Sequence, residues 1–372
     1  MKLVCKKANL LNGISAVSKA VPAKTTMPIL ECILIDASKG VIKLIANDME
    51  LGIETIIEGD IIEKGIIALN AKIFSEIIRS FTGDVITIET DGGYNTRIVC
   101  EKAKFDIVGK SGEDFSYLPE IPEIEKENSI VISQFTLKEI IRQTIFSIAD
   151  NDNNKMMTGE LFEISGNQLK VVSLDGHRIS LRNIELKDSY DYIKVVVPGK
   201  TLNEISKILT GEADKDVVIY FTDKHILFEF DNTIVLSRLI EGEYFKIDQM
   251  LSNDYETKFK INRKDFLDCI NRATLLIREG EKKPIIINVT ETNMELKINS
   301  TSGSMDENID ISKEGKDIMI GFNPKFLIDA LKVIDDEEID IYMVNPKAPC
   351  IIRNHDSSYL YLILPVNFTV TN

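Results

Sequence analysis

A helical pattern over residues 70–81 occurs three times in the chain, and this repeat limits the possible folds more than any other feature. Its counterparts are residues 198–209 and 323–334. In each copy, apolar residues recur at the offsets of one, three and four that place side chains on one face of a helix. They are Ile73, Phe74, Ile77, Ile78 and Phe81 in the first copy, Leu202, Ile205, Ile208 and Leu209 in the second, and Phe326, Leu327, Ala330, Leu331 and Ile334 in the third. The pattern predicts three similar helices.

The polar faces of the three helices also match. Each carries a basic, an acidic and a basic residue at positions i, i+4 and i+7, which form one stripe of a helix. The residues are Lys72, Glu76 and Arg79, then Lys200, Glu204 and Lys207, then Lys325, Asp329 and Lys332. A solvated face with weak ion pairs, each worth roughly 0.3 kcal/mol, explains any single copy. It does not explain three copies in one register.

The spacing of the copies divides the chain into three similar parts. Lys72 and Lys200 are 128 residues apart, and Lys200 and Lys325 are 125 residues apart. This period is too long for a solenoid and is typical of a domain repeated three times. A Gly-Glu-x-Phe segment closes each of the first two parts, at 112–115 and 242–245. We therefore expect domains at residues 1–125, 126–253 and 254–372.

Each part begins with a further helical pattern, and strands fill the rest. The helices are expected at 10–21, 137–148 and 266–277, with Asn9, Thr136 and Asn262 as N-terminal caps. Short runs rich in Ile, Val, Tyr and Phe predict strands at 30–34, 42–46, 85–89, 168–172, 217–221, 226–230, 285–289 and 359–364, among others. Two helices and about eight strands per part predict an α+β fold with mainly antiparallel sheets.

Cysteine usage and hydropathy indicate an ordinary globular protein. The five cysteines are scattered without a Cys-x-x-Cys pair, and the three histidines have no metal-ligand spacing. We expect buried free thiols, a reducing compartment, and no metal or other cofactor. No apolar run approaches the roughly 18 residues that cross a bilayer, and residues 1–7 lack the apolar segment of a signal peptide. A cytoplasmic location is expected.

The distribution of charge matters more than its sum. The net charge of −15 argues at first against a nucleic-acid partner, which usually requires a basic protein. However, the six helical stretches with their flanking residues, counted as 6–24, 70–81, 134–148, 198–209, 262–278 and 323–334, together carry +10, so the remainder carries −25. Helices gathered on one surface would hold a polyanion without sequence preference and with strong salt dependence. The alternative, that helices favour Lys and loops favour Asp, does not account for the matched register.

No enzyme motif is complete. Gly109-Lys110-Ser111 lacks the upstream glycine of a phosphate-binding loop, and residues 150–154 begin like a calcium loop but continue with Lys155 where Gly is required. Asp175 and His177 have no Ser or Cys nucleophile motif beside them. The sequence therefore predicts no catalytic residue.

The segment at 174–179, with the sequence LDGHRI, resembles a motif of the bacterial sliding clamps, the beta subunits of DNA polymerase III. The threefold period, the two Gly-Glu-x-Phe closures, the Asn-Pro-Lys-Phe start at 323–326 and the Leu-Ile-Leu-Pro-Val ending at 362–366 fit the same family. The resemblance implies that two chains join head to tail in a ring whose helices surround duplex DNA. Because a closed ring holds DNA topologically, weak phosphate contacts suffice and sliding is possible. The acidic residue of each stripe would then weaken the attraction of the stripe for DNA, so that DNA is held loosely enough to slide. These residues are Glu76, Glu204 and Asp329.

The resemblance also implies site residues. Expected DNA contacts are Lys24 and Asn151 by position in the family, and Lys72, Arg79, Lys200, Lys207, Lys325 and Lys332 from the helical stripe. A pocket for short linear peptides of polymerase subunits and the clamp loader is expected at Met157, Leu174, Gly176, His177, Arg178, Ile179, Phe245, Asn323, Phe326, Leu362, Leu364, Pro365 and Val366. The ring joint is expected at Phe105 and Ile107 on one side and Leu275 and Leu276 on the other, with Lys102 and Lys104 facing Asp306 and Glu307. A core role explains the four apolar joint residues nearly as well.

The chain departs from the family pattern at three places. Phe245 stands where proline is frequent, Gln249 stands where arginine can occur, and residues 367–372 extend past the usual end, where they could compete with peptides. We expect a non-catalytic processivity clamp. Two other classes stay open, namely an enzyme that uses Asp175 and His177 and an acidic scaffold that does not bind DNA.

Overall fold

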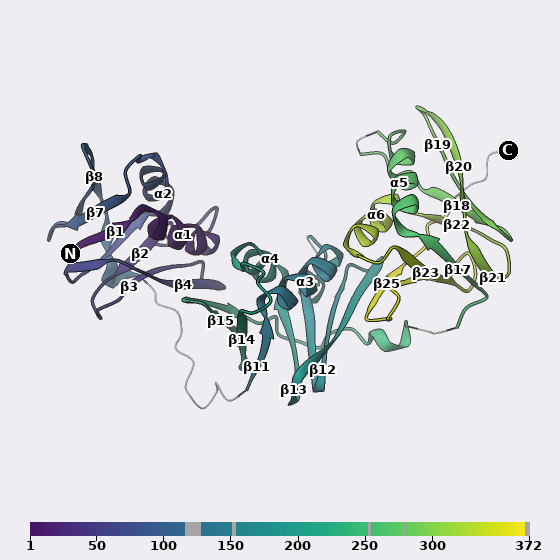
Figure 1. Ribbon diagram of the computed structural model, residues 1–372, viewed down its shortest axis with the longest axis horizontal. Helices are drawn as coiled ribbons and strands as arrows, with labels where there is room; N and C mark the ends of the chain where they lie inside the picture. Colours follow the sequence, from purple (N-terminus) through teal and green to yellow (C-terminus); the bar gives the residue numbers. More distant parts are fainter. Residues whose placement is uncertain (116–127, 151–153, 252–253, 279, 369–372) are drawn as a thin grey trace. The chain divides into compact units, whose positions relative to one another are not determined.

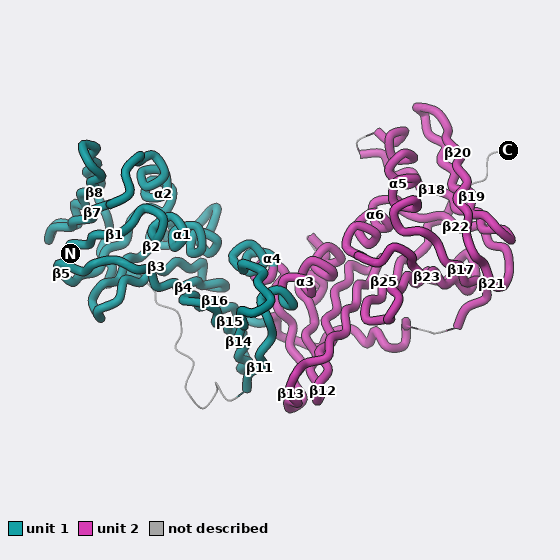
Figure 2. The backbone as a smooth tube through the Cα atoms, in the orientation of Figure 1, with its two compact units in different colours: residues 1–137, 203–239 teal, residues 138–202, 240–372 magenta. Residues whose placement is uncertain are grey.

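The computed structural model describes residues 1–115, 128–150, 154–251, 254–278 and 280–368 (Figure 1). These residues form two compact units, 1–137 with 203–239 and 138–202 with 240–372 (Figure 2). Unit 1 and unit 2 therefore each contain parts of more than one predicted repeat. The predicted domain boundaries near 125 and 253 fall outside the described residues, and those boundaries stay a prediction.

Six α-helices lie in the described part of the chain, two for each predicted repeat. The stripe helices are α2 (Ala71–Ser80), α4 (Gly199–Ile208) and α6 (Pro324–Val333). The other helices are α1 (Lys7–Val17), α3 (Gln134–Thr144) and α5 (Arg263–Thr274). The stripe helices lie where they were predicted. The second set begins three residues earlier than predicted, and α1 and α3 pass into 3₁₀ turns at Ser18–Ala20 and Ile145–Ser147.

The positions of the predicted N-terminal caps show where the helices of this second set start. Asn262 caps α5 as predicted, because its Oδ1 accepts hydrogen bonds from two backbone N–H groups of the first turn at 3.0 and 3.1 Å. Thr136 instead lies inside α3, and its N–H donates to Ser133 Oγ at 3.0 Å. Asn9 lies inside α1. These two cap predictions were wrong because each helix starts a turn before its apolar period begins.

Unit 1 contains two antiparallel sheets that pack against α1 and α2. The five-stranded sheet has the order β5-β1-β7-β8-β9, and the nine-stranded sheet has the order β10-β6-β2-β3-β4-β16-β15-β14-β11. The strands are β1 (Lys2–Lys6), β2 (Cys32–Asp36), β3 (Ile42–Asn47), β4 (Leu51–Ile57), β5 (Asp60–Glu63), β6 (Ile66–Asn70), β7 (Val85–Thr90), β8 (Asn95–Cys100), β9 (Ala103–Val108), β10 (Lys110–Ser111), β11 (Ser129–Ser133), β14 (Asp216–Phe221), β15 (His225–Phe230) and β16 (Thr233–Arg238). The pairing of β4 with β16 makes one sheet continuous across the first and second repeats.

Unit 2 repeats this arrangement with a seven-stranded sheet, β12-β13-β25-β24-β23-β17-β21, and a four-stranded sheet, β20-β19-β18-β22. The strands are β12 (Gly159–Leu174), β13 (Arg178–Pro198), β17 (Thr257–Asn262), β18 (Ile285–Val289), β19 (Asn293–Ser300), β20 (Gly303–Asp310), β21 (Ser312–Gly315), β22 (Ile318–Phe322), β23 (Glu338–Met343), β24 (Cys350–Arg353) and β25 (Tyr359–Ile363). Here β13 pairs with β25 and joins the second repeat to the third. The antiparallel α+β prediction is confirmed.

The second repeat differs from the prediction in its strands. The run predicted at 168–172 is only part of β12, which has 16 residues, and its partner β13 has 21 residues. Each of these two strands takes the place of two shorter strands in the other repeats. Their register shifts on either side of Gly166, whose φ of 60° is a left-handed conformation that favours glycine.

The residues of the predicted apolar faces are buried or half-buried, with one exception. Phe74, Ile77 and Ile78 are buried, but Ile73 is 49% exposed, so it was wrongly assigned to the core face of α2. All five cysteines are buried and free, as predicted. Burial raises the pKa of Cys5 to about 11 and that of Cys269 to about 12, so both thiols stay protonated at neutral pH. Within the described residues, no helix is long and apolar enough to cross a membrane.

Candidate surfaces for DNA, peptides and a second copy

The stripe helices present their basic residues to solvent. The exposed side chains are Lys72, Arg79, Lys200, Lys207, Lys325 and Lys332, and Lys24 is exposed in the loop that follows α1. Asn151 lies outside the described residues. Exposed cations on helices can contact phosphates without paying for desolvation of a buried charge.

The acidic residue of the stripe has a different role in different copies. Glu204 Oε1 lies 2.8 Å from Lys207 Nζ, which is the expected pairing within the stripe. Asp329 Oδ2 instead lies 2.7 Å from Nη1 of Arg178, and Arg178 belongs to the predicted peptide pocket. The hypothesis that all three acids temper the stripe is therefore wrong for Asp329.

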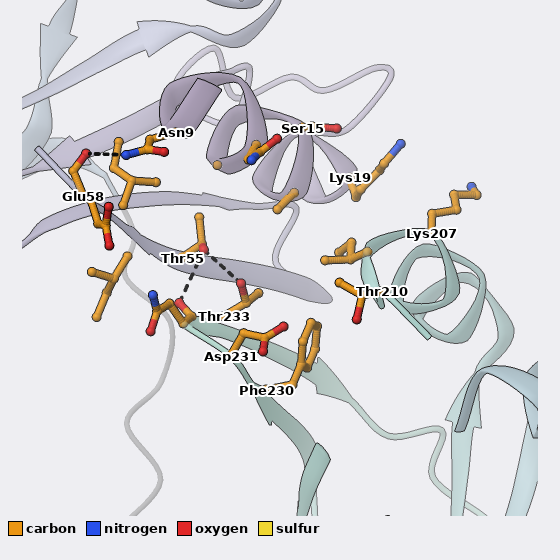
Figure 3. Close-up of a pocket in the computed structure, with 17 residues that line it drawn as sticks. Asn9, Ser15, Lys19, Thr55, Glu58, Lys207, Thr210, Phe230, Asp231 and Thr233 are labelled. Atoms are coloured by element: carbon orange, nitrogen blue, oxygen red, sulfur yellow. Dashed lines mark hydrogen bonds between the residues drawn. The ribbon is translucent and has the colours of Figure 1, made fainter. Parts of the chain in front are cut away.

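A cavity of about 620 Å³ lies beside the helices of unit 1 (Figure 3). Residues of α1, β4 and β16 line it together with the end of α4, and Lys19 and Lys207 contribute the two cations. Sequence reasoning missed Lys19 as a candidate DNA contact because it lies in the 3₁₀ turn after α1, outside the stripe pattern.

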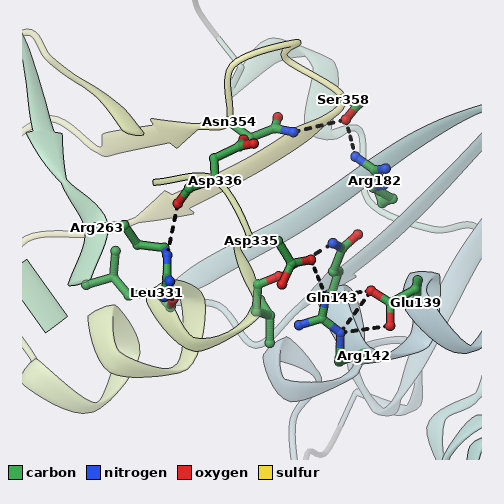
Figure 4. Close-up of polar contacts among 11 residues, drawn as sticks. Glu139, Arg142, Gln143, Arg182, Arg263, Leu331, Asp335, Asp336, Asn354 and Ser358 are labelled. Atoms are coloured by element: carbon green, nitrogen blue, oxygen red, sulfur yellow. Dashed lines mark hydrogen bonds and ion pairs between the residues drawn. The ribbon is translucent and has the colours of Figure 1, made fainter. Parts of the chain in front are cut away.

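In unit 2, an ion pair and a hydrogen bond between α3 and α6 lie at the position that corresponds to this cavity (Figure 4). Arg142 Nη2 lies 2.6 Å from Asp335 Oδ2, and Gln143 Nε2 donates to a backbone carbonyl at the end of α6 at 3.5 Å. In the repeat, Ser15 and Thr210 correspond to Arg142 and Asp335, and both line the cavity of unit 1. Two short side chains thus leave open in unit 1 the space that an ion pair fills in unit 2.

The turn between β12 and β13 is built by Asp175. Its Oδ1 accepts hydrogen bonds from the backbone N–H groups of His177 at 3.0 Å and Arg178 at 3.2 Å, and Gly176 supplies a left-handed φ of 84°. The ring of His177 lies beside Phe326, with centroids 6.2 Å apart. Asp175 therefore shapes a turn, and its contacts do not activate His177 as a base.

Arg178 joins this turn to α6. Only 7% of its side chain is exposed, and it pairs with Asp175 Oδ2 at 2.8 Å and with Asp329 Oδ2 at 2.7 Å. Its guanidinium carbon lies 4.4 Å from the centroid of the Phe326 ring, and its Nη2 donates to the carbonyl of Phe146 at 2.5 Å. Although burial disfavours the charged form, the hydrogen bond with Asp329 holds the pKa of Arg178 above its ordinary value. The sequence did not show this network.

Several predicted pocket residues meet in one apolar cluster of unit 2. Leu174, Ile179 and Leu362 are buried in it, and Met157 and Phe245 are partly buried against it. Leu364 is 38% exposed, and its N–H donates to the carbonyl of His177 at 2.9 Å; Pro365 and Val366 follow it and are half-buried. Asn323 caps α6, since its Oδ1 accepts from the N–H of Lys325 at 3.1 Å. Sequence reasoning missed Tyr244 and Leu360 of the cluster, because each looks like an ordinary core residue.

Replacing Arg178 with Ala should lower the free energy of unfolding by about 3 kcal/mol, because it leaves Asp175 and Asp329 without their cation. Urea unfolding measures this loss. Adding Asp329→Asn should cost less in the Arg178→Ala background than in the wild type. Lys215→Ala is the matched control, since it removes an exposed pair with Glu212 and should leave the stability nearly unchanged. Additive effects of Arg178→Ala and Asp329→Asn would contradict the network.

Glu160, at the start of β12, is a buried acid that sequence reasoning missed. It is 0% exposed, and its Oε2 lies 3.0 Å from Thr144 Oγ1. That hydroxyl also lies 2.8 Å from the carbonyl of Ile140, which can only accept a hydrogen bond. The hydroxyl of Thr144 donates to Glu160 Oε2 as well as to the carbonyl of Ile140, and no cation pairs with the buried carboxyl in the described contacts. Burial raises the pKa of Glu160 well above its ordinary value, although the hydrogen bond from Thr144 opposes this shift, so the folded state favours the neutral acid.

Glu160→Gln should stabilise the protein at pH 8 by about 1–3 kcal/mol. The folded state holds the proton of Glu160 while the unfolded chain releases it near pH 4.5, so stability falls as the pH rises above that value. Urea unfolding at several pH values should show a shallower decline for the variant. Glu163→Gln is the control of opposite sign. Burial alone would raise the pKa of Glu163, but hydrogen bonds from Lys170 and Tyr192 lower that pKa below its ordinary value. Glu163→Gln should therefore lose stability at neutral pH. If the free energy of unfolding of Glu160→Gln depended on pH as that of the wild type does, Glu160 would not be protonated in the folded protein.

The predicted joint residues lie at or beside two sheet edges. Phe105 (38% exposed) and Ile107 (half-buried) lie on β9, an edge strand of the five-stranded sheet. Leu275 follows α5 and is 82% exposed, so the alternative of a core role is wrong for this residue. Leu276 is half-buried. Glu307 on β20 pairs with Arg272 of its own chain. The pairs of Lys102 and Lys104 with Asp306 and Glu307 across the joint stay a prediction.

Family models of the DNA polymerase III beta subunit match three consecutive parts of the chain. The N-terminal domain matches residues 1–119, the central domain 131–246 and the C-terminal domain 248–367. The chain belongs to the DNA polymerase III beta subunit family. The beta sliding clamp of Bacillus subtilis (strain 168) is 34% identical over 380 residues, which cover 98% of this chain and 99% of the relative. The beta sliding clamp of Staphylococcus epidermidis (strain ATCC 12228 / FDA PCI 1200) is 32% identical, with the same coverage.

Solved beta subunits have the same fold. A putative DNA polymerase III beta subunit from Eubacterium rectale ATCC 33656 is 70% identical, with a TM-score of 0.96 over 99% of this chain and 100% of that one. The sliding clamp of Bacillus subtilis is 34% identical, with a TM-score of 0.95 and the same coverage. Three clamp-type domains are thereby confirmed.

A beta subunit is a DNA sliding clamp, a processivity factor without catalytic activity. The prediction of a non-catalytic clamp is confirmed, and nothing supports the enzyme or the acidic scaffold.

Proposed function

We propose that the clamp is a head-to-tail dimer whose ring closes where β9 of one protomer pairs with β20 of its partner. The supporting observation is the way each sheet continues between repeats. The last strand of the run β14-β15-β16 pairs with β4, and the last strand of the run β23-β24-β25 pairs with β13. In the repeat β9 corresponds to β16 and β25, while β20 corresponds to β4 and the first part of β13.

Both strands of the proposed joint stand at the edges of their sheets. An edge strand presents unpaired backbone N–H and C=O groups, which a second chain can pair. Two such joints related by a twofold axis close a ring, whereas one alone would leave it open. Phe105, Ile107, Leu275 and Leu276 supply apolar contacts beside the strands, and Lys102 and Lys104 face Asp306.

The ring encircles duplex DNA and holds it through exposed cations. These are Lys24, Lys72, Arg79, Lys200, Lys207, Lys325 and Lys332. Asn151, which lies outside the described residues, stays a predicted contact. Because the contacts are to phosphates, they carry no sequence preference and allow sliding. We assign the three domains to residues 1–125, 126–253 and 254–372 and place the clamp in the cytoplasm.

The apolar cluster of unit 2 is the site for short linear peptides of DNA polymerase subunits and the clamp loader. Leu174, Ile179 and Leu362 form its floor, and His177 and Leu364 border it. Apolar walls with a few polar groups suit a short extended or helical peptide.

Retention on DNA of different topology tests the ring. Clamps loaded on nicked circular plasmid should stay bound during gel filtration, and linearising the plasmid should release them, since a ring slides off a free end. Light scattering should give twice the 41.9 kDa mass of the chain. Equal retention on circular and linear DNA, or a strict monomer at micromolar concentration, would contradict the proposal.

A further inference from the structure

The end of the chain connects the peptide site to the four-stranded sheet of unit 2. After β25, the N–H of Leu364 donates to the carbonyl of His177 at 2.9 Å, and the N–H of Val366 donates to the carbonyl of Gly321 at 2.9 Å. These two bonds attach the segment 364–366 to the turn before β13 on one side and to β22 on the other. The segment that borders the peptide cluster is therefore held at both ends.

Phe368 covers the second attachment. A Cβ on Gly321 would lie 2.6 Å from Phe368 Cδ1 and 2.9 Å from the carbonyl oxygen of Val366. Both distances are shorter than real Cβ contacts, and φ at Gly321 lies outside the left-handed region. A glycine is thus needed at 321 because the aromatic ring lies directly on the backbone of β22.

The strand under Phe368 leads straight into the helix that borders the peptide site. β22 ends at Phe322, Asn323 caps α6, and the ring of Phe326 lies under the guanidinium of Arg178 at 4.4 Å. Tyr361 of β25 also donates to the carbonyl of Phe326 at 2.7 Å. A displacement of β22 or of the segment 364–366 would therefore move two borders of the site.

We propose that Phe368 is a positioning residue for peptide binding, which acts by fixing the segment 364–366 against Gly321. This inference rests on the peptide site proposed above. It opposes the expectation that residues 367–372 compete with peptides. Asn367 and Phe368 line a cavity of about 860 Å³ on the four-stranded sheet, together with Lys283, Ile286 and Met319. The aromatic side chain is thus engaged there and not in the apolar cluster.

Peptide affinity of the full-length clamp tests this role. The probe is a fluorescein-labelled five-residue peptide that has three large apolar side chains and two polar ones, a composition that suits the apolar cluster and its polar border. Phe368→Ala should weaken binding roughly three- to tenfold, mainly through faster dissociation, because the site is less preorganised. Phe368→Tyr should restore the affinity. Retention on circular DNA and the thermal midpoint should equal those of the wild type, and Ile62→Ala, which truncates an exposed side chain of β5 in unit 1, should leave the affinity unchanged.

The variant Gly321→Ala tests the same attachment from the side of β22. Its methyl group would meet both the Phe368 ring and the carbonyl oxygen of Val366, so it should weaken the peptide at least as much as Phe368→Ala does, and the double variant should be no weaker than Gly321→Ala alone. Equal or tighter binding by Phe368→Ala overturns the proposal and favours a competing tail. If the wild type itself binds no peptide, the peptide site is wrong and this inference falls with it.

Discussion

Ile107→Glu should convert the clamp from a dimer to a monomer at micromolar concentration. Ile107 lies on the edge strand β9, and a dimer contains two copies of the joint. An uncompensated carboxylate buried at each joint costs about 3 kcal/mol, so the dimer should dissociate roughly 10⁴-fold more readily. Sedimentation equilibrium measures the change directly.

Val85→Glu is the matched control for the joint. It adds the same charge to a 57% exposed residue of the same sheet, on β7, which has β1 and β8 as neighbours on its two sides. This variant should remain dimeric. Dimerisation of Ile107→Glu with wild-type affinity would mean that the chains meet through a surface other than β9.

Reversing one lysine on each stripe helix should remove most electrostatic binding to DNA. The triple variant Lys72→Glu, Lys200→Glu and Lys325→Glu changes six positions in a dimer, all of them exposed in each chain. Each lost phosphate contact lowers the salt slope by about 0.9, so retention on circular DNA at about 0.1 M salt should fall at least tenfold and depend less on salt.

The control for this variant keeps its net charge. Lys39→Glu, Lys187→Glu and Lys282→Glu alter three exposed lysines that lie outside the helices. If charge alone mattered, the two triple variants would behave alike. If the stripes hold DNA, only the helical variant should lose retention, and equal loss in both would remove the stripe assignment.

The sequence predicted the stripe helices well because two independent signals coincide there. The apolar period gives the face, and Asn70 and Asn323 give the starts of α2 and α6. In α1 and α3 the first turn carries no apolar period, so the starts were placed too late. The strand predicted at 168–172 was too short because Gly166-Asn167 is a turn-like sequence, yet Gly166 and Gln168 both pair with β13 and β12 continues through them.

The residues of the peptide site were found more completely than their contacts. Leu174, Ile179 and Leu362 follow from the family motif, and they share one cluster. The partnership of Arg178 with Asp329 spans 151 residues, and a pattern along one helix assigned Asp329 to the wrong face. Glu160 carried no local signal at all, since burial by distant strands determines its protonation.

The cavity between α1 and the end of α4 predicts that the clamp is not equally stiff along its length. In unit 2 the matching helices are tied by Arg142 and Asp335, whereas in unit 1 Ser15 and Thr210 leave an open space of about 620 Å³. A bending load should therefore be absorbed first where the first and second repeats meet. The junction between the second and third repeats, which Arg142 and Asp335 tie together, should deform less under the same load.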